Sequence, residues 1–143
     1  MKNKFEILEH PADIGIVAFG TNLLEAFENS AVGLYSIMFD QSGISASETK
    51  IIKLSSSSID FLLVKWLNEI LFLFETEEFI GSEIKVFEIH QMDESISLSA
   101  EIKGDKFNRQ NHVFKIGVKA VTLHQLEITS EENESKIKVF FDI

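Results

Sequence analysis

The sequence predicts an α+β fold, in which a mainly antiparallel β-sheet packs against two α-helices. Two observations carry this prediction. Apolar residues recur at helical spacing over residues 22–38 and about 58–77, and they alternate with polar residues in most of the remaining runs. The predicted elements follow the order β-β-α-β-α and then a series of strands, which is typical of α+β proteins and not of alternating α/β proteins.

The first half of the chain contains both predicted helices. Residues 5–8 and 14–19 form two apolar runs around a short turn, and they read as a pair of strands. Asn22 followed by Glu25 resembles a capping box at the start of the first helix. A short strand is predicted at about residues 50–55, and Ser57, three residues before Asp60, indicates the start of the second helix. This helix is apolar almost all round, so we expect it to form the centre of the core.

The second half reads as strands. Residues 95–103 alternate strictly between polar and apolar, and the run after Gly81 pairs with them as a predicted hairpin. We expect the chain to turn at residues 104–105 and to form strands over 113–118 and 119–129. The apolar positions of the latter run change parity, which predicts a β-bulge near His124 and Gln125. The last predicted strand covers residues 136–141.

Composition limits the classes of function. A length of 143 residues with 45% hydrophobic residues predicts one domain over residues 1–143. The absence of cysteine excludes disulfides, thiolate zinc sites and cysteine nucleophiles. A net charge of −10 disfavours direct binding to nucleic acid and favours cations and basic proteins as partners. No segment resembles a signal peptide or a membrane span, so we expect a cytoplasmic protein.

Candidate chemistry lies at the two ends of the chain. The hexapeptide HPADIG at residues 10–15 holds the only proline and places Asp13 beside a predicted strand, and Asp142 stands next to Ile143 at the other end. Carboxylate and main-chain oxygens are ligands of hard cations such as Ca²⁺ or Mg²⁺. Two simpler interpretations stay open at this point. Asp13 could cap its own turn, and the acidic end could be a frayed tail.

The other reactive residue types give no recognisable site. The four histidines lack the spacing of a helical zinc pair, so each is interpreted as structural. The sequence contains no glycine-rich phosphate loop and no Gly-x-Ser-x-Gly elbow, and it offers no catalytic triad.

Four motifs together resemble the archease family. They are HPADIG at residues 10–15, WLNEIL at 66–71, KAVTLH at 119–124 and FDI at 141–143, and they follow the family's order over essentially the whole chain. Two positions depart from the family pattern: Pro11 stands where the family usually has Thr, and Leu123 where it usually has Tyr.

The resemblance implies an accessory protein and not an enzyme. Archeases activate the RNA-splicing ligase by promoting guanylylation of its active-site histidine, and they support multiple turnover in tRNA splicing and RNA repair. The family's metal site, usually described with Ca²⁺, corresponds here to Asp13, Asp142 and Ile143, with Mg²⁺ as the alternative metal. His10, Lys119 and His124 are expected to contact the partner or its nucleotide. The competing hypotheses are a stand-alone metal-dependent hydrolase and a chaperone-like interaction module.

Overall fold

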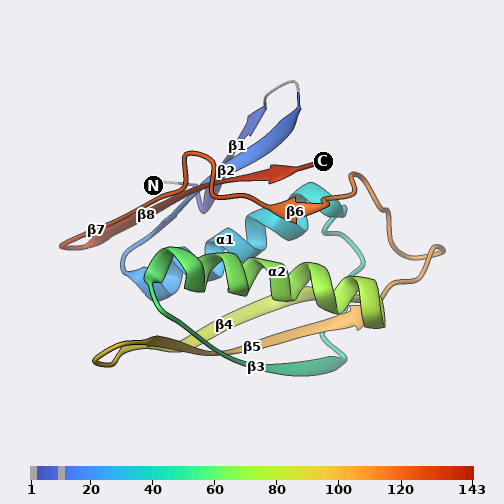
Figure 1. Ribbon diagram of the computed structural model, residues 1–143. Coiled ribbons are helices and arrows are strands. Elements are labelled where there is room, and N and C mark those ends of the chain that lie inside the picture. The colour runs from blue at the N-terminus through green and yellow to red at the C-terminus, as the bar shows by residue number, and fades with distance from the viewer. Residues whose placement is uncertain (1–2, 10–11) are drawn as a thin grey trace.

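The fold has three layers, with two helices between two antiparallel sheets (Figure 1). The computed structural model describes residues 3–9 and 12–143. The prediction of a mainly antiparallel α+β fold with two helices is confirmed. The elements are β1 (Phe5–Glu9), β2 (Asp13–Gly20), α1 (Leu23–Met38), β3 (Glu48–Ser56), α2 (Ile59–Glu77), β4 (Phe79–Gln91), β5 (Ile96–Lys106), β6 (Ala120–Val121), β7 (Glu127–Glu131) and β8 (Glu134–Asp142).

The larger sheet joins elements from both ends of the chain. Its strand order is β1-β2-β8-β6, and β7 pairs with β8 as well. The smaller sheet has the order β3-β5-β4 and comes entirely from the middle of the chain. Because β2 and β8 are neighbours, the beginning and the end of the chain meet in one sheet.

Both helices begin at a capping side chain. The Asn22 Oδ1 atom accepts a hydrogen bond from the Glu25 backbone N–H at 2.9 Å, as the capping-box prediction requires. The start of α2 differs from the prediction by one residue. Ser58, and not Ser57, has the extended backbone of a cap, and its hydroxyl accepts from the Phe61 N–H at 3.2 Å.

The hydrophobic core fills both interfaces of the helix layer. Trp66 of α2 is fully buried, and its Nε1–H donates to the Phe27 main-chain oxygen of α1 at 3.0 Å. This bond satisfies the polar atom of the largest side chain in the core and links the two helices. The prediction that α2 forms the centre of the core is correct for the side that faces the sheets. No helix in the described part of the chain is long and apolar enough to cross a membrane.

Three details of the predicted second half are wrong. Gly104 does not turn the chain but lies inside β5, where a Cβ atom would overlap the main-chain oxygen of Ile80. Residues 113–118 form no strand, because their main chain bonds to the end of α1, as in the bond from the Lys115 N–H to the Met38 oxygen at 2.7 Å. The predicted bulge is a complete break between β6 and β7, with Gln125 in the left-handed conformation.

Candidate functional site

Asp13 and Asp142 lie directly opposite each other on neighbouring strands. Asp13 is the first residue of β2, Asp142 is the last residue of β8, and the two are register partners in the antiparallel pair. Asp13 is half-buried, and Asp142 is exposed. Side chains at such positions have Cβ atoms about 4.5–5.5 Å apart. The sheet therefore places two carboxylates from opposite ends of the chain side by side.

The core positions of these strands determine where the carboxylates point. On β2 the buried residues include Ile14 and Ile16, and on β8 they include Val139 and Phe141. Because side chains alternate between the faces of a sheet, residues one step from the core positions face away from the helices. Asp13 and Asp142 therefore lie on the outer face of the larger sheet.

A ring stacked on a glycine supports this end of the sheet. Phe140 also belongs to the outer-face positions of β8, yet it is only 2% exposed. It packs against its register partner Gly15, where a Cβ atom would lie 2.6 Å from the Phe140 Cδ1 atom. The His124 ring packs against the Phe140 ring at a tilt, with 5.9 Å between the two centroids. The Lys138 Nζ atom lies 5.8 Å from the centroid of the Phe140 ring. Only glycine at position 15 leaves room for the ring.

The segment before His124 fastens the end of β8. The Lys119 backbone N–H donates to the Asp142 main-chain oxygen at 2.8 Å. Thr122 donates both its backbone N–H and its hydroxyl to the Phe140 main-chain oxygen, each at 3.0 Å. The Thr122 hydroxyl in turn accepts from the His124 N–H at 3.2 Å. The sequence reasoning did not single out Thr122, although it stands inside the motif KAVTLH.

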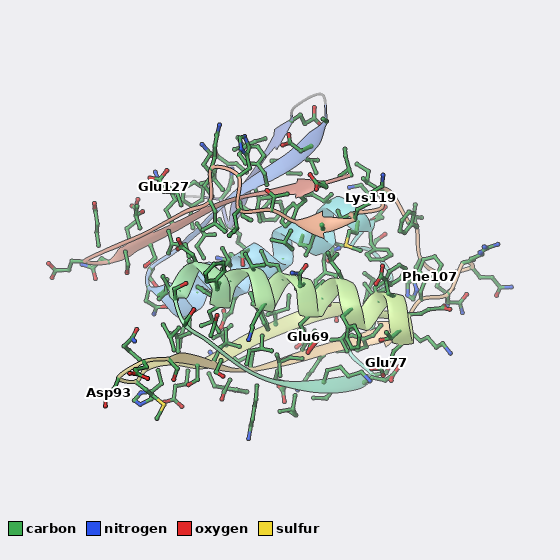
Figure 2. All side chains as sticks on the ribbon, in the orientation of Figure 1. Glu69, Glu77, Asp93, Phe107, Lys119 and Glu127 are labelled. Atoms are coloured by element: carbon green, nitrogen blue, oxygen red, sulfur yellow. The ribbon has the colours of Figure 1, made fainter. Side chains whose placement is uncertain are left out.

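The structure thus brings together Asp13, Asp142, Lys119 and His124, with Ile143 adjoining Asp142. The side chains of Lys119 and His124 are exposed, and Figure 2 shows Lys119 beside β6. His10 and Pro11 of the predicted motif lie outside the described residues. Leu123, the position that departs from the family pattern, is 54% exposed.

Asp13 and Asp142 are the two side-chain carboxylates that the register of β2 and β8 places opposite each other. Neither aspartate forms an ion pair with a described residue. No group of three or more His, Cys, Asp or Glu side chains in residues 3–9 and 12–143 is arranged to hold a metal ion. A cation between the aspartates would therefore complete its coordination with main-chain oxygen and water, which suits Ca²⁺ and Mg²⁺.

A buried histidine occupies a separate place. His112 is 4% exposed, its Nδ1 atom accepts from the Asn108 N–H at 2.9 Å, and its Nε2 atom has no hydrogen-bond partner in the described chain. The nearest acidic atom is Asp105 Oδ2, at 3.7 Å from Nε2. A hydrogen bond from the Lys106 backbone N–H is the main reason why the pKa of Asp105 lies below its usual value. His112 orders the loop that follows β5, which fits the prediction of a structural histidine.

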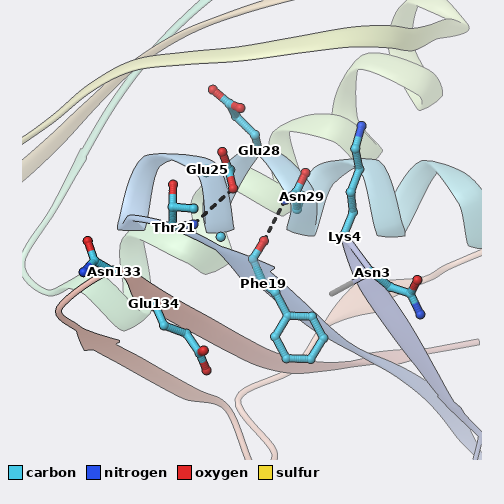
Figure 3. Close-up of a pocket in the computed structure, with 10 residues that line it drawn as sticks. Asn3, Lys4, Phe19, Thr21, Glu25, Glu28, Asn29, Asn133 and Glu134 are labelled. Carbon is cyan, nitrogen blue, oxygen red and sulfur yellow. Dashed lines mark hydrogen bonds between the residues drawn. The ribbon is translucent and has the colours of Figure 1, made fainter. Parts of the chain in front are cut away.

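A hollow of about 580 Å³ lies at the other end of β2, and none of the predicted site residues lines it (Figure 3). Its polar side chains hold the fold together. The buried Asn29 donates from Nδ2 to the Phe19 oxygen at 2.6 Å, and Glu28 accepts from the Val86 N–H at 2.9 Å. The sequence offered no signal for this hollow, because its walls come from four separate segments of the chain.

The comparison with known families decides what kind of protein this is. A model described as the archease protein family matches residues 5–143. The chain belongs to the archease family. Archeases of Methanosarcina acetivorans and Saccharolobus islandicus are 36% and 37% identical to it, over 98% and 97% of this chain and 96% and 98% of their own lengths.

Two solved structures of similar proteins agree with the archease fold. The solution structure of protein 1598 of Methanobacterium thermoautotrophicum superimposes with a TM-score of 0.82 at 33% identity, over 98% of this chain and 99% of that one. A crystal structure of the Thermotoga maritima archease, described there as a possible chaperone, has a TM-score of 0.60 at 20% identity. It covers 95% of this chain and 94% of its own chain, and it shares the fold.

Proposed function

We propose that the protein is a metal-binding accessory factor that activates an RNA-splicing ligase by promoting its guanylylation. One observation carries the proposal: a chain that belongs to the archease family over nearly its whole length places Asp13 directly opposite Asp142. The family resemblance supplies the ligase as the partner. In this proposal the protein itself is not an enzyme, and it acts in tRNA splicing and RNA repair in the cytoplasm.

The residues at the end of β8 fit a divalent cation. Like charges on directly opposite strand positions destabilise a sheet unless something compensates them, and no described cation does so here. Asp13, Asp142 and a main-chain oxygen of Ile143 are the proposed ligands, with Ca²⁺ as the expected metal and Mg²⁺ as the alternative. The bound ion would supply positive charge that neutralises the two carboxylates.

The chain's own residues give the site its rigidity. The bond from the Lys119 N–H and the two bonds from Thr122 tie the last residues of β8 to the segment that contains β6. Lys119 and His124 are exposed on this segment, which borders the end of β8, and a partner can contact them there. His10 is proposed as a third contact from the sequence motif alone. The net charge of −10 favours association with the basic surface of an RNA-binding protein.

A chaperone-like role is the second candidate. The Thermotoga maritima relative is described as a possible chaperone, and this chain exposes large apolar side chains such as Phe72 and Phe87, each 54% exposed. Such a role requires protection of unrelated unfolded proteins without any dependence on metal. A hydrolase requires turnover of a phosphoester by this chain alone.

A guanylylation assay tests the proposal. Purified ligase is incubated with radiolabelled GTP, with and without this protein, in the presence of Ca²⁺ or a chelator. We expect stimulation that needs the metal and that Asp13→Asn and Asp142→Asn abolish. The control Glu131→Gln, at the end of β7 beside the turn into β8, should stimulate normally. Stimulation by both aspartate variants would refute the metal site. Turnover of RNA or phosphoester without ligase would favour the hydrolase instead.

A further inference from the structure

Helix α2 leaves an apolar face uncovered. Phe61 and Phe72 are 48% and 54% exposed, although the same helix buries Trp66 completely. In Figure 1, α2 lies on the near side of the molecule, and no strand passes in front of it. A helix that is apolar all round is normally covered on every side, so this exposed face calls for an explanation.

The exposed phenylalanines lie on one stripe. They are eleven residues apart, which corresponds to three helical turns and about 16 Å along the axis. Asn68 is exposed between them on the same side, and Val64 is half-buried beside it. We define the α2 stripe as Phe61, Val64, Asn68 and Phe72. Amphipathic helices that bind other proteins present their apolar residues along one face, at i, i+3, i+4 and i+7, and such a face can extend along this stripe.

Acidic residues border the α2 stripe. Asp60 and Glu75 are exposed, Glu69 is half-buried, and none of them forms an ion pair with a described residue. Figure 2 shows Glu69 at the edge of α2. Lys65, four residues after Phe61, is exposed on the same face of α2, and its Nζ atom donates to the Ser55 main-chain oxygen at 2.7 Å. The three acidic residues outnumber this lysine, so the surroundings of the stripe carry a net negative charge.

We propose that the α2 stripe is a docking surface for a cationic amphipathic helix of a partner protein. The apolar residues of such a helix would cover Phe61 and Phe72, and its Lys or Arg residues would pair with the acidic border. A second copy of this chain fits less well, because each copy carries a net charge of −10. The proposal is independent of the aspartate pair, which lies in the larger sheet.

The other exposed phenylalanine of equal accessibility provides a matched control. Phe87 is 54% exposed, like Phe72, but it lies in β4 at a shift in the register between Val86 and Glu88. It belongs to the smaller sheet and not to the α2 stripe. A single exposed apolar side chain is ordinary in a folded protein. Replacing it removes the same side chain without touching α2.

Peptide binding tests the proposal. The probe is a fluorescently labelled 18-residue peptide of leucine and lysine, with leucine at helical spacing, and its binding is followed by fluorescence anisotropy. We expect the double variant Phe61→Ala/Phe72→Ala to bind at least tenfold more weakly than the unmodified protein, and Phe87→Ala to bind within twofold of it. A peptide with glutamate in place of lysine should not bind. Circular dichroism and thermal unfolding verify that each variant is folded.

Three results would overturn the proposal. The first is unchanged peptide affinity in the folded double variant, and the second is an equal loss in Phe87→Ala, which indicates unspecific apolar binding. The third is a dimer of the unmodified protein in sedimentation that the double variant abolishes, since the occupant is then a second copy. Charge reversal of the border by Glu69→Lys should weaken binding of the lysine peptide severalfold, and an unchanged affinity contradicts the role of the border.

Discussion

The pairing of Asp13 with Asp142 predicts that Asp142→Asn raises the stability of the protein in the absence of divalent cations and lowers it, relative to the unmodified protein, in the presence of calcium. Without divalent cations, Asp142→Asn removes a like charge directly opposite Asp13. Such an opposition costs about 0.2–1 kcal/mol, less at high ionic strength. The variant should therefore unfold at a temperature about 1–4 °C higher than the unmodified protein, since 1 kcal/mol corresponds to about 3–4 °C for a chain of this length.

With calcium the order should reverse. A ligand that binds only the folded state at one hundred times its dissociation constant adds about 2.7 kcal/mol, which corresponds to about 8–11 °C in Tm. The unmodified protein should gain this increment, and Asp142→Asn should lose most of it because one of the two carboxylates is missing. Thermal unfolding at low salt, with chelator and across a calcium titration, measures both effects on the same samples.

The chain contains an internal control for the charge effect. Glu131 and Glu134 are also register partners, at the hairpin that joins β7 and β8. Glu131→Gln removes a like charge from that pair but leaves Asp13 and Asp142 in place. It should respond to calcium like the unmodified protein. Equal calcium shifts in the unmodified protein and Asp142→Asn would refute the reasoning, and so would the absence of any shift in the unmodified protein.

Three further predictions concern the fold. Ser58→Ala should destabilise the protein by about 1 kcal/mol through loss of the α2 cap, whereas Ser57→Ala should have little effect, and urea unfolding distinguishes the two. Gly104→Ala should cost at least about 1–3 kcal/mol in the same assay, because its Cβ atom would overlap the Ile80 main-chain oxygen. Because the pKa of Asp105 is lower in the folded state than its ordinary value of 3.8, the ionised carboxylate stabilises the folded state at pH values above 3.8. The deficit of Asp105→Asn in unfolding free energy should therefore be complete at neutral pH and shrink below about pH 3.8, and an unchanged deficit at pH 3 would contradict it.

Periodicity and capping residues predicted most of the fold. The helical spacing in residues 22–38 and the alternation in residues 95–103 predict which face of each element is buried. The structure buries those faces. The predictions fail where the conformation of a segment depends on main-chain atoms that are distant in the sequence. Gly104 is predicted to lie in a turn because glycine is common in turns. In the structure the position needs glycine because the Ile80 main-chain oxygen leaves no room for a Cβ atom. Residues 113–118 alternate like a strand, but their hydrogen-bond partners are the last residues of α1.

The candidate site was predictable only in part. Asp13 and Asp142 are visible in the sequence, but their separation by almost the whole chain hides the pairing of β2 with β8. The residues themselves suggested a cation site built from both ends of the chain, but nothing in their spacing shows that the ends meet. The family resemblance supplied that association. The sequence also gave no reason to single out Thr122, whose role depends on the Phe140 oxygen that accepts its two bonds.

The same register serves the core and the candidate site. Ile14 pairs with Phe141, and both are buried against the helices, so Asp13 and Asp142, one step further along, must lie together on the outer face. A slip of one residue between β2 and β8 would turn Phe141 outward and Asp142 inward, which would bury a charge and expose the core. The cost of that slip fixes the register without any contribution from the aspartates. The aspartates can therefore stay opposite each other although neither pairs with a described basic side chain, and the cation of the proposed function would relieve their mutual repulsion.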